Sequence, residues 1–481
     1  MRFPRGCRPG LSVIAAIFLY SLSPFAQAAT FVVTKTADTN DGTCDSDCSL
    51  REAIIAANAS VGADVITLPA GHYTLMIAGT NEDAGATGDL DIVGDLTING
   101  AGASTTIVDG GGIDRVFHIV SAFTVVFNDR QVFNGFLPFA NGGGILNEGT
   151  LTLNNCTVGE NAAPNGDGGG IYNDDTLTIS GGVVAENAAT NGDGGGIYDN
   201  GNSITITNTT IAANLAPGGD GAGLYHNGVD ATISQSAIFG NSASGGDGGG
   251  IYFNGNTLTM TNCTVTGNDA FDGGGIFVNG NTANFVAATI AGNTATNTGG
   301  GIQVGSVPQL TGTIVANNTG GNCSGNVTDS GTNLQFPGTT CGGSITSADP
   351  LLGPLADNGG PTQTMALGIG SPAIDANTES CPPPGVDQRG IARPQGAACD
   401  IGAFELVPGG GPTPTPTVTA PAATPTATPA GVPTVTSTPP GPTPTRGPGP
   451  VTPVPTLSGD LLIVLAAALA LVAVLVMRRS G

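Results

Sequence analysis

The chain repeats one short pattern of polar and apolar positions seven times. Each repeat opens with a Gly-rich turn followed by an aliphatic residue, and successive aliphatic residues are 25 to 27 positions apart. A fixed period of this length is typical of solenoids, in which each repeat forms one supersecondary unit. The seven aliphatic positions are Ile145, Ile171, Ile197, Leu224, Ile251, Ile276 and Ile302.

Each repeat holds two further apolar stretches that alternate with polar residues. Residues 177–179, 204–206 and 258–260 alternate an apolar residue with Thr, which predicts a strand, and a third short stretch ends in Asn. Three short strands cannot bury an apolar face alone, so each must pair in parallel with its copy about 4.8 Å away in the next coil. The pattern therefore predicts an all-β solenoid, a parallel β-helix with coils of about 26 residues.

The repeat register predicts which side chains lie above one another. A second inward stack holds Val158, Val184, Ile211, Ile238, Val265, Ile290 and Ile314. A ladder of amides holds Asn161, Asn187, Asn214, Asn241, Asn268, Asn293 and Asn317. Stacked Asn amides hydrogen-bond along a ladder, so we assign these residues a structural role.

Two outward rows are candidate binding residues. The possible glycan-facing row holds Tyr172, Tyr198, Tyr225 and Tyr252, which follow the inward aliphatic residues directly. An equal interpretation is a packing ladder that stiffens the wall. The possible calcium row holds Asp167, Asp193, Asp220, Asp247 and Asp272, just before the Gly turns. The alternative is turn-forming Asp in water, with repulsion relieved by splayed loops.

The repeats, with Gly-Gly-x-Ile/Leu and x-x-x-Asn signatures over residues 141–317, resemble those of chlamydial polymorphic outer-membrane proteins and related surface proteins. That resemblance implies a right-handed β-helix. Residues 48–53 resemble the CSLREA-type N-terminal domain of bacterial surface proteins, and Ser49 with Glu52 predicts a capping box before a helix. Residues 355–406, with motifs such as 371–375 and 387–390, resemble the choice-of-anchor Q domain.

Both ends of the chain predict export. A basic head, a short apolar run and an A-x-A-like end over residues 1–28 predict a signal peptide. Residues 408–455 hold 16 of the 33 prolines and predict a disordered, extended stalk. The apolar residues 461–477 and the arginines after them predict one transmembrane helix with a cytoplasmic tail, and residues 454–458 resemble an IPTL-type sorting signal.

These features divide the chain into six predicted parts. They are a signal peptide (1–28), a CSLREA-type cap with the first coil (29–85), the parallel β-helix (86–350), a β-rich choice-of-anchor Q-like domain (351–407), the Pro/Thr-rich stalk (408–456) and the transmembrane anchor or sorting segment (457–481).

Cysteine usage fits an exported protein, where disulfides persist. Of 105 possible pairings of eight cysteines, the economical one joins neighbours at the solenoid ends, and it leaves two free thiols at one repeat position, Cys156 and Cys263. The neighbouring pairs are Cys44–Cys48, Cys323–Cys341 and Cys381–Cys399. A zinc site is not expected, because His72, His118 and His226 lie far from these pairs in sequence.

The formal charge of −24 excludes nucleic acid as a partner and favours cations or neutral glycans. A polysaccharide lyase or glycosidase is the alternative function. A lyase needs a base and cations to neutralise a uronate, yet there is no Lys or Arg between Gln131 and Gln388. We therefore predict a non-catalytic envelope or cell-surface protein that contacts extracellular glycans or a neighbouring cell and needs no cofactor unless the Asp row binds Ca²⁺.

Overall fold

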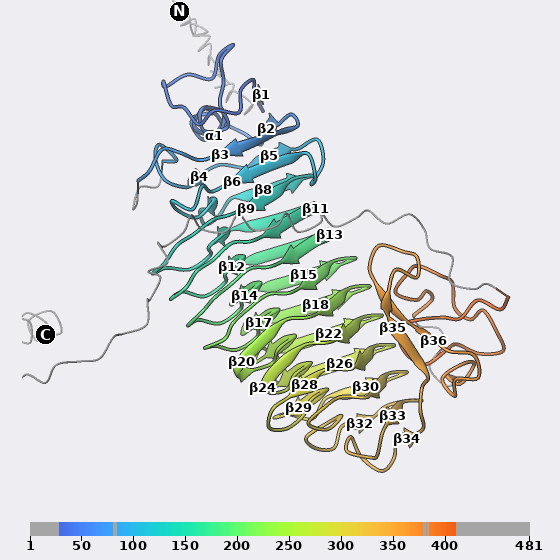
Figure 1. Ribbon diagram of the computed structural model, residues 1–481. Helices are drawn as coiled ribbons and strands as arrows, with labels where there is room; N and C mark the ends of the chain where they lie inside the picture. The colour runs from blue at the N-terminus through green and yellow to red at the C-terminus, as the bar shows by residue number, and fades with distance from the viewer. Residues whose placement is uncertain (1–27, 80–83, 379–380, 382–383, 410–481) are drawn as a thin grey trace, which may run out of the picture. The chain divides into compact units, whose positions relative to one another are not determined.

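The computed structural model describes residues 28–79, 84–378, 381 and 384–409 (Figure 1). The predicted signal peptide, stalk and transmembrane segment lie outside these ranges. The exceptions are Ala28 of the signal peptide and Pro408 and Gly409 of the stalk. Within the described ranges, no helix combines the length and the apolar character needed to cross a bilayer.

The described chain winds into a parallel β-helix, as the repeat predicts. One wall is a sheet of nine short strands, each paired in parallel with its copy in the next coil. Its strands are β4 (Leu90–Ile92), β7 (Phe117–Ile119), β10 (Ile145–Asn147), β12 (Ile171–Asn173), β14 (Ile197–Asp199), β17 (Leu224–His226), β21 (Ile251–Phe253), β25 (Ile276–Val278) and β29 (Ile302–Val304). We call this sheet the short-strand wall.

A larger sheet of 22 strands forms two further, adjoining ladders of the coil. The first ladder holds β1 (Thr30–Val32), β2 (Asp64–Thr67), β5 (Leu96–Asn99), β8 (Thr124–Asn128), β15 (Ser203–Thr207), β18 (Asp230–Ser234), β22 (Thr257–Thr261), β26 (Thr282–Val286), β30 (Gln309–Thr311) and β32 (Thr328–Asp329). The second holds β3 (Gly71–Thr74), β6 (Thr106–Asp109), β9 (Gln131–Phe133), β16 (Thr210–Ala212), β19 (Ala237–Phe239), β23 (Thr264–Thr266), β27 (Thr289–Ala291), β31 (Ile314–Ala316), β33 (Leu334–Phe336) and β34 (Thr346–Ser347). The longer β11 (Thr150–Gly159) and β13 (Thr176–Ala185) run through both. A small third sheet holds β20 (Ser242–Asp247), β24 (Asp269–Asp272) and β28 (Thr294–Ala295).

The predicted inward stacks form the core, with one correction at the last of the seven predicted repeats. Val315, not Ile314, pairs with Ile290, and Asn318, not Asn317, receives the amide ladder from Asn293. The residue before each ladder Asn turns the corner with positive φ, and Asn317 occupies that position at 56°. Asn tolerates this left-handed conformation. In this repeat the third strand and its ladder Asn are therefore offset by one residue from the predicted register, whereas Ile302 pairs with Ile276 as predicted.

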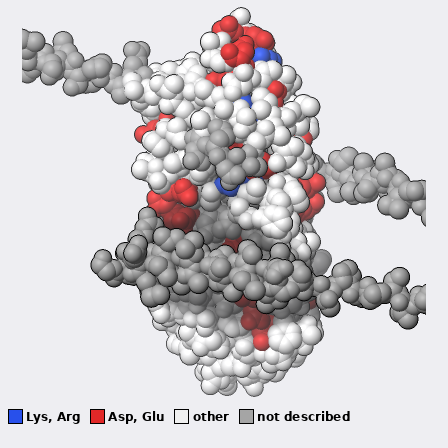
Figure 2. Space-filling view, turned by 90° about the vertical axis from the view of Figure 1, so that its left-hand side faces the viewer, with Lys and Arg blue, Asp and Glu red and all other residues white. Residues whose placement is uncertain are grey.

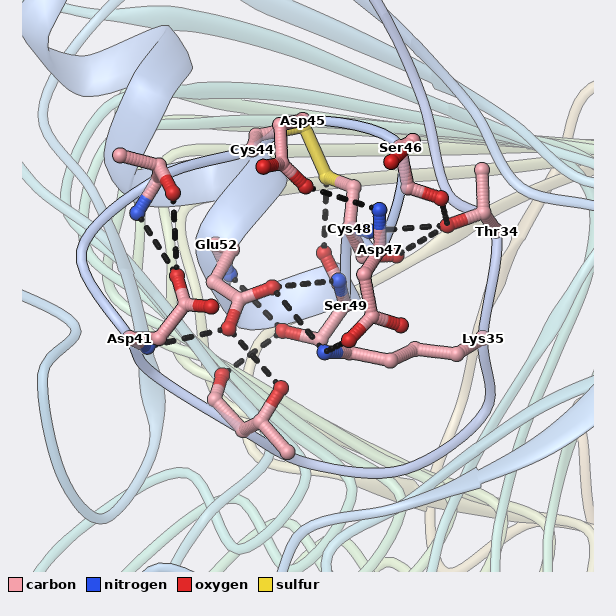
Figure 3. Close-up of a disulfide and its surroundings, with 12 residues drawn as sticks. Thr34, Lys35, Asp41, Cys44, Asp45, Ser46, Asp47, Cys48, Ser49 and Glu52 are labelled. Carbon is pink, nitrogen blue, oxygen red and sulfur yellow. Dashed lines mark hydrogen bonds and ion pairs between the residues drawn. A yellow bond between two sulfur atoms is a disulfide. The ribbon is translucent and has the colours of Figure 1, made fainter.

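The N-terminal cap is the helix α1 (Leu50–Ala59), which begins at the predicted capping box of Ser49 and Glu52. Glu52 accepts hydrogen bonds from the Ser49 N–H at 2.7 Å and the Thr39 hydroxyl at 2.8 Å, close to the Cys44–Cys48 disulfide (Figure 3). The first strand of the solenoid is β1, which precedes α1 and pairs in parallel with β2.

The segment after the last coil lies beside the solenoid instead of extending it (Figure 1). Among the described residues of 351–407, regular strands are limited to the antiparallel pair β35 (Leu352–Ala356) and β36 (Thr364–Leu367), so the segment is less β-rich than predicted. Gln388 accepts a hydrogen bond from the Thr264 hydroxyl at 2.7 Å, and the Ala403 N–H donates to the Thr289 hydroxyl at 3.0 Å. The segment therefore covers the outer face of the later coils, where Ile314 packs outward with Ile401 and Phe404.

Candidate functional site

The tyrosine row stands on the outer face of the short-strand wall. Each Tyr is the middle residue of a three-residue strand, between two buried neighbours, and is itself half-buried. Register pairs Tyr172, Tyr198, Tyr225 and Tyr252 directly, and neighbouring ring centroids lie 4.9 Å apart with interplanar angles of 2 to 4°. Phe277 continues the stack at 4.9 Å. The rings therefore cover one another's faces and present their edges and hydroxyl groups outward.

The aspartate row forms a hydrogen-bonded ladder beside the tyrosines. Each carboxylate accepts a hydrogen bond from the backbone N–H of the Asp in the next coil, at 2.7 to 3.2 Å. At the N-terminal end the Asn141 amide oxygen accepts from Asp167 at 3.0 Å, and at the other end Asp272 accepts from Thr298 at 2.8 Å. The row is thus held in register by the backbone, whereas the alternative interpretation of turn-forming Asp assumed splayed loops.

Stacking half-buried carboxylates changes their acidity. Burial, followed by the charges of Asp220 and Asp167, raises the pKa of Asp193 to about 6, against a hydrogen bond from the Asp220 N–H that lowers it. Burial and the nearby carboxylates raise the pKa of Tyr198 to about 12. At neutral pH the tyrosines are therefore hydroxyl donors and the aspartates mostly anionic acceptors. Figure 2 shows Asp and Glu gathered in several patches on one face, with few Lys or Arg.

A third row, which the sequence analysis missed, runs along the other side of the tyrosines. Its exposed amides bond from coil to coil at 2.8 to 3.0 Å. The row holds Asp174, Asn200, Asn227, Asn254 and Asn279. Their spacing of 25 to 27 residues was the available signal. We call the Asp, Tyr and Asn rows together the three-row face.

The tyrosine column continues toward the N-terminus through Leu146, His118 and Asp91. His118 contacts Asp91 at 2.9 Å through Nδ1 and Glu148 at 3.4 Å through Nε2. Although burial lowers the pKa of His118, its hydrogen bond to Asp91 raises the pKa above the ordinary value. Burial raises the pKa of nearby Asp89 to about 7, although the charge of Arg115 lowers it. No zinc site was expected at His118, because it lies far from the cysteine pairs in sequence. Its 27-residue spacing from Asp91 is one repeat and is the signal that places the two together.

Metal-type side chains gather at this end and not along the aspartate row. In the part of the chain that the structure describes, the donor atoms of Asp89, Asp91 and His118 lie within 4.8 Å of one another, and no other group of three such residues does. The described aspartates of the predicted calcium row share one edge without forming such a group.

The cysteines divide between disulfides and the core. Disulfides join Cys44 to Cys48, Cys323 to Cys341, and Cys381 to Cys399. Cys156 and Cys263 are free and buried. Burial raises the pKa of the Cys263 thiol to about 12, so this thiol is unreactive at neutral pH.

A match to a family model supports the fold. Residues 133–340 match the family model described as the right handed beta helix region, which confirms a right-handed β-helix. One solved structure, pectate lyase Pel9A, is similar with a TM-score of 0.47 and 17% identity, covering 78% of this chain and 96% of that chain. No curated protein matches the sequence.

Proposed function

We propose that this chain is a non-catalytic surface protein whose three-row face binds an extended neutral glycan. The observation that carries the proposal is the unbroken register of the tyrosine, aspartate and asparagine rows. From Tyr172 to Tyr252 the phenolic groups repeat three times at 4.9 Å. The face is thus about 15 Å long, enough for several units of a polymer laid along the solenoid.

The chemistry of the face suits sugar hydroxyl groups. Phenols donate, carboxylates accept, and the exposed amides of residues such as Asn227 do both. Stacking of a sugar ring on a tyrosine face is not part of the proposal, because neighbouring rings occupy those faces. Contact would therefore run through the hydroxyl groups and ring edges of Tyr198 and Tyr225.

Charge supports a neutral polymer over an acidic one. Asp193 and Asp220 flank the tyrosine row and would repel uronate carboxylates. A lyase acting on uronates also needs cations to neutralise the substrate and a base to remove a proton. The sequence places no Lys or Arg between Gln131 and Gln388 to supply them.

In this proposal the chain is exported and displayed at the cell envelope. Residues 1–28 would direct export, 408–456 would form a spacer, and 457–481 would anchor the chain in the membrane. The end regions would be CSLREA-type and choice-of-anchor Q-like domains, with an IPTL-like sorting segment last. Three disulfides agree with an oxidising compartment.

The test is a glycan array probed with the purified full-length chain in detergent. The informative variant is the double change Tyr198→Phe with Tyr225→Phe, because Phe277 already stacks in this column and the ladder should survive. Removing two hydroxyl groups should weaken binding to neutral glycans about tenfold or more. An unchanged affinity would overturn the assignment of the face, and depolymerisation of any bound glycan by the unmodified chain would overturn the non-catalytic function.

A further inference from the structure

The short-strand wall carries a second polar group at its N-terminal end, independent of the three-row face. Asp89 and Asp91 flank the inward residue Leu90, so both carboxylates lie on the outer face of the short-strand wall. Register places His118 beside Asp91 in the next coil. Two carboxylates and one imidazole from two adjacent coils therefore lie close together.

The donor atoms of this group are close together and shielded from water. All three lie within 4.8 Å of one another, and the His118 Nδ1 is 2.9 Å from an Asp91 carboxylate oxygen. The side chain of Asp91 is 1% exposed, that of Asp89 12% and that of His118 14%. Zinc ligands lie about 2.0 to 2.2 Å from the ion, so small side-chain movements would bring these three atoms into range.

The other ring nitrogen of His118 has the partner that a metal-bound histidine requires. Its Nε2 faces the Glu148 carboxylate at 3.4 Å, across the next coil. A histidine that binds metal through one nitrogen almost always donates its other N–H to a carboxylate, carbonyl or water, which fixes the ring and its tautomer. In the tautomer that carries its proton on Nε2, directed at Glu148, the Nδ1 lone pair faces Asp91 and can bind a cation.

The charges around the group are not balanced by protein cations. Asp89, Asp91, Asp114 and Glu148 supply four carboxyl groups, and the salt-bridge partner among the described residues is Arg115, 3.1 Å from Asp89. Arg51 passes nearby and donates to the Asp89 carbonyl, but its guanidinium is paired with Asp38 at 2.7 Å. Excess negative charge at a shielded site favours either bound protons or a divalent cation.

We propose that Asp89, Asp91 and His118 form a Zn²⁺ site, with Glu148 orienting the imidazole. Mixed nitrogen and oxygen donors favour Zn²⁺ over Ca²⁺, which prefers oxygen ligands alone. The ion joins β4 to β7 and so ties together two of the first coils of the short-strand wall. Because the ligands come from two coils, binding stabilises the wound state over the unwound chain.

The experiment is titration of the full-length, EDTA-treated chain with ZnCl₂ by isothermal calorimetry, with the thermal midpoint measured in parallel. We expect saturable binding of one ion per chain, a higher thermal midpoint with Zn²⁺, and at least tenfold weaker binding of CaCl₂. His118→Gln and Asp89→Asn should each lose the site. The matched control is His72→Gln, because His72 also contacts an aspartate, Asp109, at 2.7 Å but is half-exposed and has no third ligand.

Each outcome decides the proposal. Loss of zinc binding in His118→Gln and its retention in His72→Gln would support the site, provided circular dichroism shows the same β-content in both. Asp89→Asn covers the case in which His118→Gln fails to fold, since Asp89 lies outside the strand. Absence of saturable binding would overturn the proposal and leave His118 as a protonated bridge between Asp91 and Glu148. Zinc binding that persists in both ligand variants would also overturn it.

Discussion

Replacing Asp193 with Asn should stabilise the solenoid at neutral pH. The backbone N–H of Asp220 donates to the Asp193 carboxylate at 2.8 Å, and an Asn amide oxygen can accept the same bond. Asn141 already does so for Asp167 at 3.0 Å. Asp193→Asn therefore keeps the ladder geometry and removes only the charge.

The magnitude follows from the acidity of the folded carboxyl group. Burial raises the pKa of Asp193 from its ordinary 3.8 to about 6. A raised pKa means that the folded state holds the proton more tightly, so stability is lost as pH rises through about 6. Two pKa units correspond to about 3 kcal/mol, and partial exposure of the group reduces this to about 1 to 1.5 kcal/mol.

The assay is urea unfolding of the full-length chain and of Asp193→Asn, followed by circular dichroism at pH 4 and pH 7.5. We expect nearly equal stability at pH 4 and a gain of about 1 to 1.5 kcal/mol for the variant at pH 7.5. Equal destabilisation at both pH values would refute the reasoning, because the carboxylate would then be needed for structure. Repeating the measurement with EDTA and with millimolar Ca²⁺ tests the calcium hypothesis, which requires calcium-dependent stability in the unmodified chain and its loss in the variant.

Two further predictions concern the turns between strands. Asn214→Ala should cost about 3 kcal/mol or more in unfolding free energy, because the buried amide accepts two hydrogen bonds from Asn187 and donates one each to Asn241 and the Val184 carbonyl. The exposed Asn227→Ala should cost less than about 0.5 kcal/mol by the same urea assay. Gly194→Ala should prevent soluble expression, since an added Cβ would lie 2.5 Å from the Ile197 carbonyl oxygen. Gly390 also has positive φ, but its surroundings are open, so Gly390→Ala should lower the free energy of unfolding by only about 1 to 2 kcal/mol. Equal yields of folded protein from both Gly variants would contradict this account.

The sequence was sufficient to predict whatever repeats with the coil. The alternation around Tyr172 placed its side chain on the outer face, and the common spacing fixed the register of the aspartate row and of the buried Asn ladder. The exposed asparagine row has the same spacing but was not identified. The predicted register was wrong where the repeat length changes by one residue. Two adjacent asparagines end the ladder, and only the backbone conformation of Asn317 shows that Asn318 carries the amide bonds.

Features that do not repeat could not be predicted in this way. The lateral packing of the C-terminal segment depends on single contacts such as Thr264 to Gln388, which are 124 residues apart. The group around His118 combines residues from three successive coils. These coils carry different residue types at equivalent repeat positions, so no recurring residue type marks the group. The contact between Thr264 and Gln388 arises from tertiary packing and leaves no periodic trace in the sequence. The spacing of Asp91 and His118 is one repeat, but no repeated residue type shows that they form a group with Glu148.

The fold needs a hydrogen-bond acceptor at each position of the aspartate row, but it does not need a negative charge there. Each coil requires an acceptor for the next N–H, and Asn141 shows that a neutral amide is sufficient. Carboxylates at Asp193 and Asp220 instead add repulsion and desolvation, which raise the pKa of both groups. The fold is therefore less stable at neutral pH with these charges than it would be with amides. A charge that the ladder does not need, beside a row of outward hydroxyl groups, favours a role for this face in binding rather than in holding the coils together.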